Sequence, residues 1–170
     1  IERHYGRQWV QLDARHNAYF LWNWNSGVLQ LDYDGKPVRE IPLPLPLRQL
    51  RLIPKQKEFI VVHDQLTIAR YDENGNNLWT VNNPALIELS DQISSDIEVS
   101  DSGKHLAISC FDRGVFVYSD AESIRNIELE FPVSHTALSR NGRRLILADS
   151  QGGLFLVDLD GNIIWDHTLQ

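Results

Sequence analysis

A short turn motif recurs along this chain at nearly constant spacing. The pattern D-x-x-G-x-x-x-W is found at residues 72–79 and 158–165, and residues 32–39 repeat it with Arg39 in place of the tryptophan. The three copies begin 40 and 86 residues apart, which corresponds to one and two steps of 40 to 43 residues. Such a period predicts a repeat architecture, in which each repeat is one supersecondary unit that packs against its neighbours.

The residues between the turn motifs have the pattern of short β-strands. Apolar and polar residues alternate with a period of two, for example at residues 28–33, and turns rich in Gly, Asn, Asp and Ser separate these runs. No segment has the 3.6-residue periodicity of an amphipathic helix. Four short strands in each repeat of about 40 residues are typical of β-propeller blades.

We therefore predict an all-β fold, a β-propeller built from four four-stranded antiparallel blades. The pattern leaves open whether these blades form a closed four-bladed disc or half of a larger ring. The expected blades belong to a single repeat domain and lie at about residues 9–42, 47–81, 97–129 and 133–169.

The motifs resemble those of two propeller families. The D-x-x-G-x-x-x-W turn is similar to the blade motif of PQQ-like β-propellers, whereas residues 100–109 (SDSGKHLAIS) resemble a WD-repeat-like blade. Residues 138–149 share features of both families. In the PQQ-like family the motif tryptophan packs between neighbouring blades, so the resemblance implies that Trp79 and Trp165 are blade-docking residues. Burying an indole between two sheets removes roughly 200 Å2 of surface from water.

The balance of charge limits the kinds of partner. The chain of 170 residues has a formal net charge of −7, which argues against nucleic acid and anionic membrane as partners. No apolar run approaches the roughly 18 residues of a membrane helix. Residues 1–60 carry a net +3 and residues 61–170 a net −10; this is compatible with a solvated surface of uneven charge or with association between unlike ends of two copies. We predict protein partners, with a homodimer as one option.

Cysteine usage bears on the compartment. The single cysteine, Cys110, excludes an internal disulfide and a site with two metal-binding thiols. It lies in the apolar run 106–110, where we expect a buried side chain. The lack of disulfides favours the reducing cytoplasm, with the periplasm after removal of a signal peptide as the alternative. The chain begins at Ile1 and contains no methionine, so we expect it to be part of a longer protein.

The sequence contains no recognisable catalytic or metal-binding motif. Asp72, Asn74 and Asn76 have the one-three-five spacing of an EF-hand loop, but Asn77 and Asn83 stand where that loop needs glycine and glutamate. The copy near the C-terminus fails at the same two positions. These Asp and Asn residues are therefore interpreted as turn formers. We predict no catalytic residue, no metal and no cofactor.

The predicted function is a non-catalytic protein-interaction or assembly scaffold, because propeller loops carry function while the strands supply stability. The alternative is a ligand-sensing or quinoprotein-like enzyme fragment, whose site would lie in the channel of a larger or dimeric ring. Trp24 is the most distinctive residue of the expected surface, although its alternation with Trp22 is also compatible with a place in the core. The expected interaction surface comprises Trp24, Asn25, His63, Asp64, Phe111, Asp112, Arg113 and Gln151.

Overall fold

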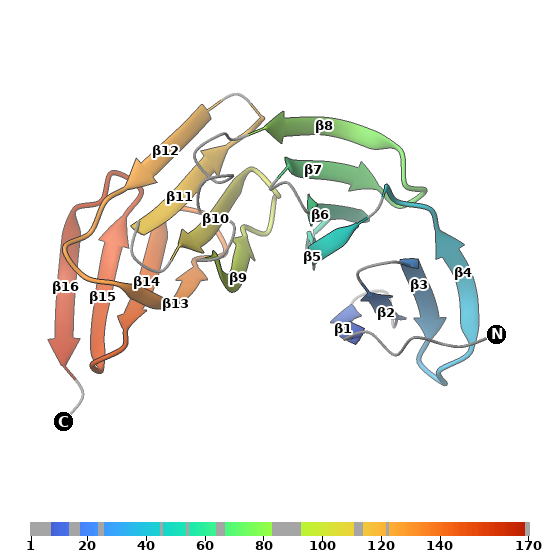
Figure 1. Cartoon of the computed structure of the whole chain (residues 1–170), viewed down its shortest axis with the longest axis horizontal. Coiled ribbons are helices and arrows are strands. Elements are labelled where there is room, and N and C mark those ends of the chain that lie inside the picture. The colour runs from blue at the N-terminus through green and yellow to red at the C-terminus, as the bar shows by residue number, and fades with distance from the viewer. Residues whose placement is uncertain are drawn as a thin grey trace. The chain divides into compact units, whose positions relative to one another are not determined.

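The regular structure of the described residues consists of β-strands. The computed structural model describes residues 8–13, 18–23, 26–44, 46–53, 55–63, 67–82, 93–110, 114–121 and 123–168. In these ranges sixteen strands form four antiparallel sheets of four strands each, and every sheet uses consecutive strands in chain order (Figure 1). The prediction of an all-β fold with four four-stranded antiparallel blades is confirmed.

The chain divides into two compact units, Ile1–Asn83 and Pro84–Gln170, and each unit contains two sheets. The first sheet of the first unit consists of β1 (Gln8–Asp13), β2 (Ala18–Asn23), β3 (Ser26–Asp32) and β4 (Pro37–Ile41). Its second sheet consists of β5 (Leu47–Leu52), β6 (Glu58–His63), β7 (Thr67–Asp72) and β8 (Asn77–Asn82).

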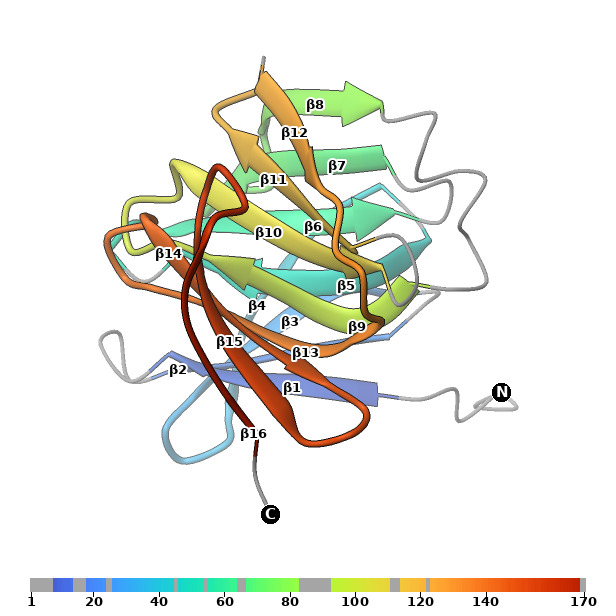
Figure 2. The same cartoon turned by 90° about the vertical axis from the view of Figure 1, so that its left-hand side faces the viewer.

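The second unit repeats this arrangement. Its first sheet consists of β9 (Ile93–Val99), β10 (His105–Cys110), β11 (Gly114–Ser119) and β12 (Ser123–Ile127). Its second sheet consists of β13 (Val133–Leu138), β14 (Arg144–Asp149), β15 (Gly153–Asp158) and β16 (Ile163–Thr168), with β16 at the edge (Figure 2). The described residues include no helix that is long and apolar enough to span a membrane.

The D-x-x-G turn connects the third and fourth strands of a sheet, and its residue types follow from its hydrogen bonds. In the turn between β7 and β8, Asp72 Oδ1 accepts the backbone N–H groups of Asn74 (2.8 Å) and Asn76 (2.9 Å). Gly75 N donates to Asp72 O (3.1 Å), and its φ of +85° favours glycine. The aspartate thus satisfies the backbone of its own turn, as sequence reasoning expects.

The core of the first unit lies between its two sheets. Phe20 from β2 and Phe59 from β6 meet edge to face with ring centroids 5.4 Å apart. Trp22, Leu50 and Val61 belong to the same buried cluster. This apolar layer is what holds the first sheet against the second, because burial of each large side chain contributes about 1.5–3 kcal/mol.

The two sheets of the second unit share a core but are buried to different extents. Val117 and Leu145, one from each sheet, belong to its buried cluster. Strand β10 holds five consecutive buried residues at 106–110, including Cys110, so both faces of its sheet are buried. Strand β14 has buried Leu145 and Leu147 on one face and exposed side chains on the other. One face of sheet β13–β16 is therefore open.

Candidate functional site

The motif tryptophan and its counterparts occupy one position on the fourth strand of each sheet, which we call the docking position. Arg125 belongs to the repeat that lacks the motif and is placed by geometry: it lies two residues before the buried Ile127, as Arg39 lies two residues before the buried Ile41. The docking position is held by Arg39 on β4, Trp79 on β8, Arg125 on β12 and Trp165 on β16.

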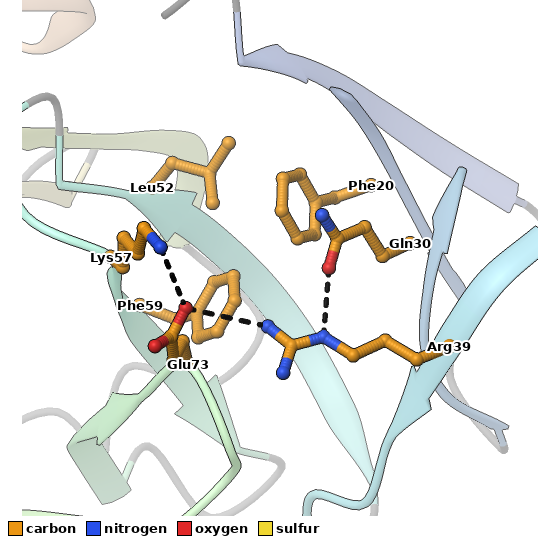
Figure 3. A pocket seen from close by; sticks show the side chains of 7 residues that line it. All are labelled: Phe20, Gln30, Arg39, Leu52, Lys57, Phe59 and Glu73. Atoms are coloured by element: carbon orange, nitrogen blue, oxygen red, sulfur yellow. Dashed lines mark hydrogen bonds and ion pairs between the residues drawn. The ribbon is translucent and has the colours of Figure 1, made fainter. Parts of the chain in front are cut away.

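Arg39 joins the first sheet to the D-x-x-G turn of the second sheet (Figure 3). Its Nε donates to Gln30 Oε1 (2.8 Å), and its Nη1 donates to Asn74 Oδ1 (3.3 Å). Its Nη2 lies 3.7 Å from Glu73 Oε2, which also pairs with Lys57 Nζ at 3.4 Å. The guanidinium thus contacts the second and third residues of the turn.

A cavity of about 240 Å3 lies beside Arg39, at the place where the other motif copies carry an indole (Figure 3). Apolar side chains from both sheets and the charged groups around Glu73 line it. Small-molecule sites usually occupy about 300–1,000 Å3, so this cavity is smaller than most of them. We interpret it as a gap that a thin guanidinium leaves in place of a bulky ring. The cavity is lined by Phe20, Gln30, Arg39, Leu52, Lys57, Phe59 and Glu73.

Arg125 makes the same connection in the second unit. Its Nη1 donates to the backbone oxygen of Leu159 (3.3 Å), and the guanidinium forms an ion pair with Asp160. Leu159 and Asp160 are again the second and third residues of a D-x-x-G turn. Both units therefore dock an arginine of one sheet onto the D-x-x-G turn of the next sheet.

The turn glycines show which turns are covered. A Cβ added at Gly75 would lie 2.5 Å from the backbone oxygen of Pro42, and one at Gly161 would lie 3.0 Å from Ile127 Cγ2. A Cβ at Gly35 would meet nothing within 4 Å. Among the three D-x-x-G turns that join a third to a fourth strand, the turn at Gly35 is thus the one onto which no described strand packs.

Trp165 lies on the open face of sheet β13–β16. It pairs with Leu156 across the sheet, and Leu156 pairs with Ile146. Trp165 and Ile146 are each 49% exposed. The indole stacks on His167 of its own strand, with centroids 5.9 Å apart. The blade-docking roles implied for Trp79, which is half-buried, and for Trp165 stay predictions.

Most of the predicted interaction surface lies outside the described residues, and its role stays a prediction. The two described members belong to different units, and Gln151 is exposed in the turn between β14 and β15. His63 is half-buried in a hydrogen-bond network rather than presented to solvent. Its Nδ1 lies 3.2 Å from Pro46 O and its Nε2 lies 2.9 Å from Tyr71 Oη. The members outside the described residues are Trp24, Asn25, Asp64, Phe111, Asp112 and Arg113.

Burial and hydrogen bonding shift several ionisable groups. Burial lowers the pKa of His63, and the neutral ring can donate from Nδ1 to Pro46 O while Nε2 accepts from Tyr71. Burial, with a smaller effect of Lys104, lowers the pKa of His105. The Asn76 side chain lowers the pKa of Asp72 by hydrogen bonding to its carboxylate. The shifts of His63 and Asp72 accompany structural hydrogen bonds, whereas that of His105 follows from burial beside Lys104.

Sequence reasoning could have found Arg39 but missed Arg125. Arg39 stands at the tryptophan position of a recognisable motif copy, which was a signal that it faces the next sheet. Arg125 follows a turn without the D-x-x-G pattern, so only the strand pairing reveals its position. In the described part of the chain, no group of three or more His, Cys, Asp or Glu residues is arranged to hold a metal ion.

Comparison with solved structures identifies the architecture. The chain superposes on the Pan2 WD40 domain of Neurospora crassa with a TM-score of 0.68 at 13% identity, covering 98% of this chain and 51% of that one. It superposes on the Cps50 (Swd1) β-propeller domain of Myceliophteria thermophila with a TM-score of 0.76 at 11% identity, covering 100% of this chain and 57% of that one. The fold is that of a β-propeller.

These similarities support the WD-repeat-like resemblance, whereas the PQQ-like resemblance stays a prediction. The chain spans about half the length of the two propellers that it matches. No protein-family model and no curated protein matches the sequence. At 11–13% identity the likeness concerns the fold alone.

Proposed function

We propose that this chain is a non-catalytic protein-interaction or assembly scaffold of the β-propeller type. The observation that carries the proposal is the open apolar face of sheet β13–β16. Two rows of paired residues cross this face without Lys or Arg, and the adjoining pair, Arg144 and Asp158, brings one charge of each sign. The rows are Ala137, Ile146, Leu156 and Trp165, and His135, Ala148, Leu154 and His167.

An apolar sheet face of this kind is suited to a protein partner. Contiguous exposed apolar surface on a soluble domain marks an interaction site, and aromatic residues are enriched at such sites. The lack of Lys and Arg in the two rows, together with the net charge of −7, disfavours nucleic acid and anionic membrane. The likeness to WD40 and other propeller domains supports the same class of function by analogy of fold.

Site-specific photo-crosslinking tests this proposal. A benzophenone amino acid is placed at Ile146 on the open face, and at Leu78 of β8 as a control with the same 49% exposure. After irradiation in cells that produce the chain, we expect protein adducts from position 146 well in excess of those from position 78. Mass spectrometry identifies the partner as another protein or as a second copy of this chain.

The proposal fails if position 146 yields no more protein adducts than position 78. An adduct with a different protein supports the scaffold function without a second copy, because crosslinking reports whatever covers the open face.

A further inference from the structure

The docking contact is formed twice among the described residues. Its two parts, a fourth strand and a D-x-x-G turn, also occur outside these two contacts. Arg39 on β4 contacts the turn of β7 and β8, and Arg125 on β12 contacts the turn of β15 and β16. In both cases the isoleucine two residues later, Ile41 or Ile127, is buried close to the turn glycine. The contact is thus a repeated module made of a fourth strand and a D-x-x-G turn.

Strand β16 and the turn between β3 and β4 take part in neither of these two contacts. On β16, Trp165 is half exposed, and His167, which takes the place of the buried isoleucine, is exposed. The turn between β3 and β4 is open around Gly35, and its Tyr33 is 54% exposed. The strand lies at the end of the last sheet, and the turn belongs to the first sheet.

The side chains of this strand and this turn suit each other. In the two formed contacts an arginine faces Glu73 and Asn74, or Leu159 and Asp160. The corresponding turn residues in the first sheet are Tyr33 and Asp34. Tyr33 offers a ring to an indole, and aromatic pairs contribute about 0.5–1.5 kcal/mol beyond the area that they bury.

We infer that Trp165 of one copy docks onto the Asp32–Gly35 turn of a second copy, so that the open face of sheet β13–β16 packs on the outer face of sheet β1–β4. This inference rests on the proposed function and names the partner as a second molecule of this chain. An apolar row crosses most of the outer face of the first sheet. Val10, which is 65% exposed, pairs with the half-buried Leu21, Leu21 pairs with Leu29, and the row ends at the exposed Glu40.

Two observations favour a second copy as the occupant. One chain covers 51% and 57% of the propellers that it matches, so two copies together supply about the length of one such propeller. The contact also has a suitable size: four strands about 4.8 Å apart and six residues of about 3.3 Å each give a face of roughly 400 Å2. Each contact buries two such faces, about 800 Å2 in all. Two contacts between the same pair of copies then remove about 1,600 Å2 from water, the size of a standard stable interface.

The test is the mass of the chain by light scattering over a dilution series. Wild-type protein is expected at twice the chain mass of 19.6 kDa. Trp165→Glu places a carboxylate opposite Asp34 and is expected to raise the dissociation constant by about tenfold or more. Trp165→Arg reproduces the contact of Arg125 with Asp160 and is expected to keep the pair, which then weakens as salt is added.

Two further variants control for misfolding and for general loss of apolar surface. Ile163→Glu changes a side chain that is 53% exposed and pairs with Val157 on the other face, so association is expected to persist. Adding Asp34→Arg to Trp165→Glu is expected to restore the pair, because the two charges then attract. Circular dichroism and thermal unfolding check that each variant is folded.

A wild-type monomer at every concentration would overturn the inference, as would equal weakening by Trp165→Glu and Trp165→Arg. Neither result contradicts the scaffold proposal, which is supported if position 146 crosslinks to a different protein. Absence of both self-association and crosslinks removes both proposals.

Discussion

The two sheets of the second unit have the same strand order and the same antiparallel pairing, yet they differ in how they are covered. Strands β10 and β11 hold unbroken runs of buried residues, whereas β14 alternates and every residue of β16 is exposed. Both sheets nevertheless carry apolar side chains on two faces. The difference shows that a repeat can place apolar side chains on both faces of its sheet even where one of those faces is exposed.

The largest difference in the free energy of unfolding is expected when an isoleucine is truncated to alanine in the covered sheet and in the open sheet. Ile108 on β10 is 1% exposed and Ile146 on β14 is 49% exposed. Ile108→Ala is expected to lower the free energy of unfolding by about 2–5 kcal/mol, because it leaves a cavity. Ile146→Ala is expected to change it by no more than about 0.5 kcal/mol in the monomer. Urea unfolding measures both, and equal losses would remove the distinction between covered and open faces.

A smaller difference is expected between a covered and an open turn of the first unit. Both glycines have positive φ, so Gly35→Ala is expected to cost about 1–2 kcal/mol from backbone strain alone. Gly75→Ala meets the same strain and also places its Cβ 2.5 Å from Pro42 O, a backbone atom that cannot swing away. The loss in unfolding free energy should therefore be larger for Gly75→Ala, and an equal loss would argue against docking at this turn.

The ion pair between Arg125 and Asp160, which joins the two sheets, should contribute little to the free energy of unfolding. The side chains of Arg125 and Asp160 are 54% and 67% exposed, and such pairs contribute about 0–1 kcal/mol. Arg125→Ala is expected to fall in this range, with a loss that shrinks as salt rises. Arg143→Ala, at an exposed residue of a neighbouring turn, is the matched control. A loss of several kcal/mol would show that Arg125 does more than join exposed charges.

The last prediction concerns pH and the histidine of the covered sheet. His105 begins β10, its Nδ1 is buried without a partner among the described residues, and its pKa is lowered. The pKa of His63 is lowered too. The unfolded chain therefore binds more protons than the folded chain as pH falls through about 6.5, so stability is present above that value and declines below it.

Thermal unfolding between pH 8 and pH 5 measures this decline, which we expect to be a small drop in Tm. His105→Gln should make the drop smaller, because a glutamine does not titrate. A Tm that rises as pH falls over this range would contradict the direction of both shifts.

The repeats and turns could be predicted because their causes are local. Asp72 is needed for its carboxylate and Gly75 for its positive φ, and both requirements are visible in a motif of four residues. Strand alternation then accounts for four strands in each repeat. The prediction of a buried Cys110 holds for the same reason, since it belongs to a continuous apolar run.

The coverage of the docking positions could not be predicted, because it depends on what lies beside each sheet. Trp79 and Trp165 belong to identical motifs, yet one is half-buried and the other is exposed. Arg125 makes the docking contact in a repeat that lacks the motif, so the turn sequence gives no sign of that contact. The interaction surface that the sequence predicts lies in loops and stays a prediction, whereas the open apolar surface lies on a sheet.

The exposure of β16 also has a consequence for solubility. Ile163, Ile164 and Trp165 form an apolar run at the edge of a sheet, where unpaired backbone groups can template further strands. Asp166 is the one formally charged residue of this strand, and charges at such positions keep edge strands from adding to one another. Replacing Asp166 would therefore favour fibrous aggregation of natively folded molecules, even in a variant whose folding equilibrium is unchanged.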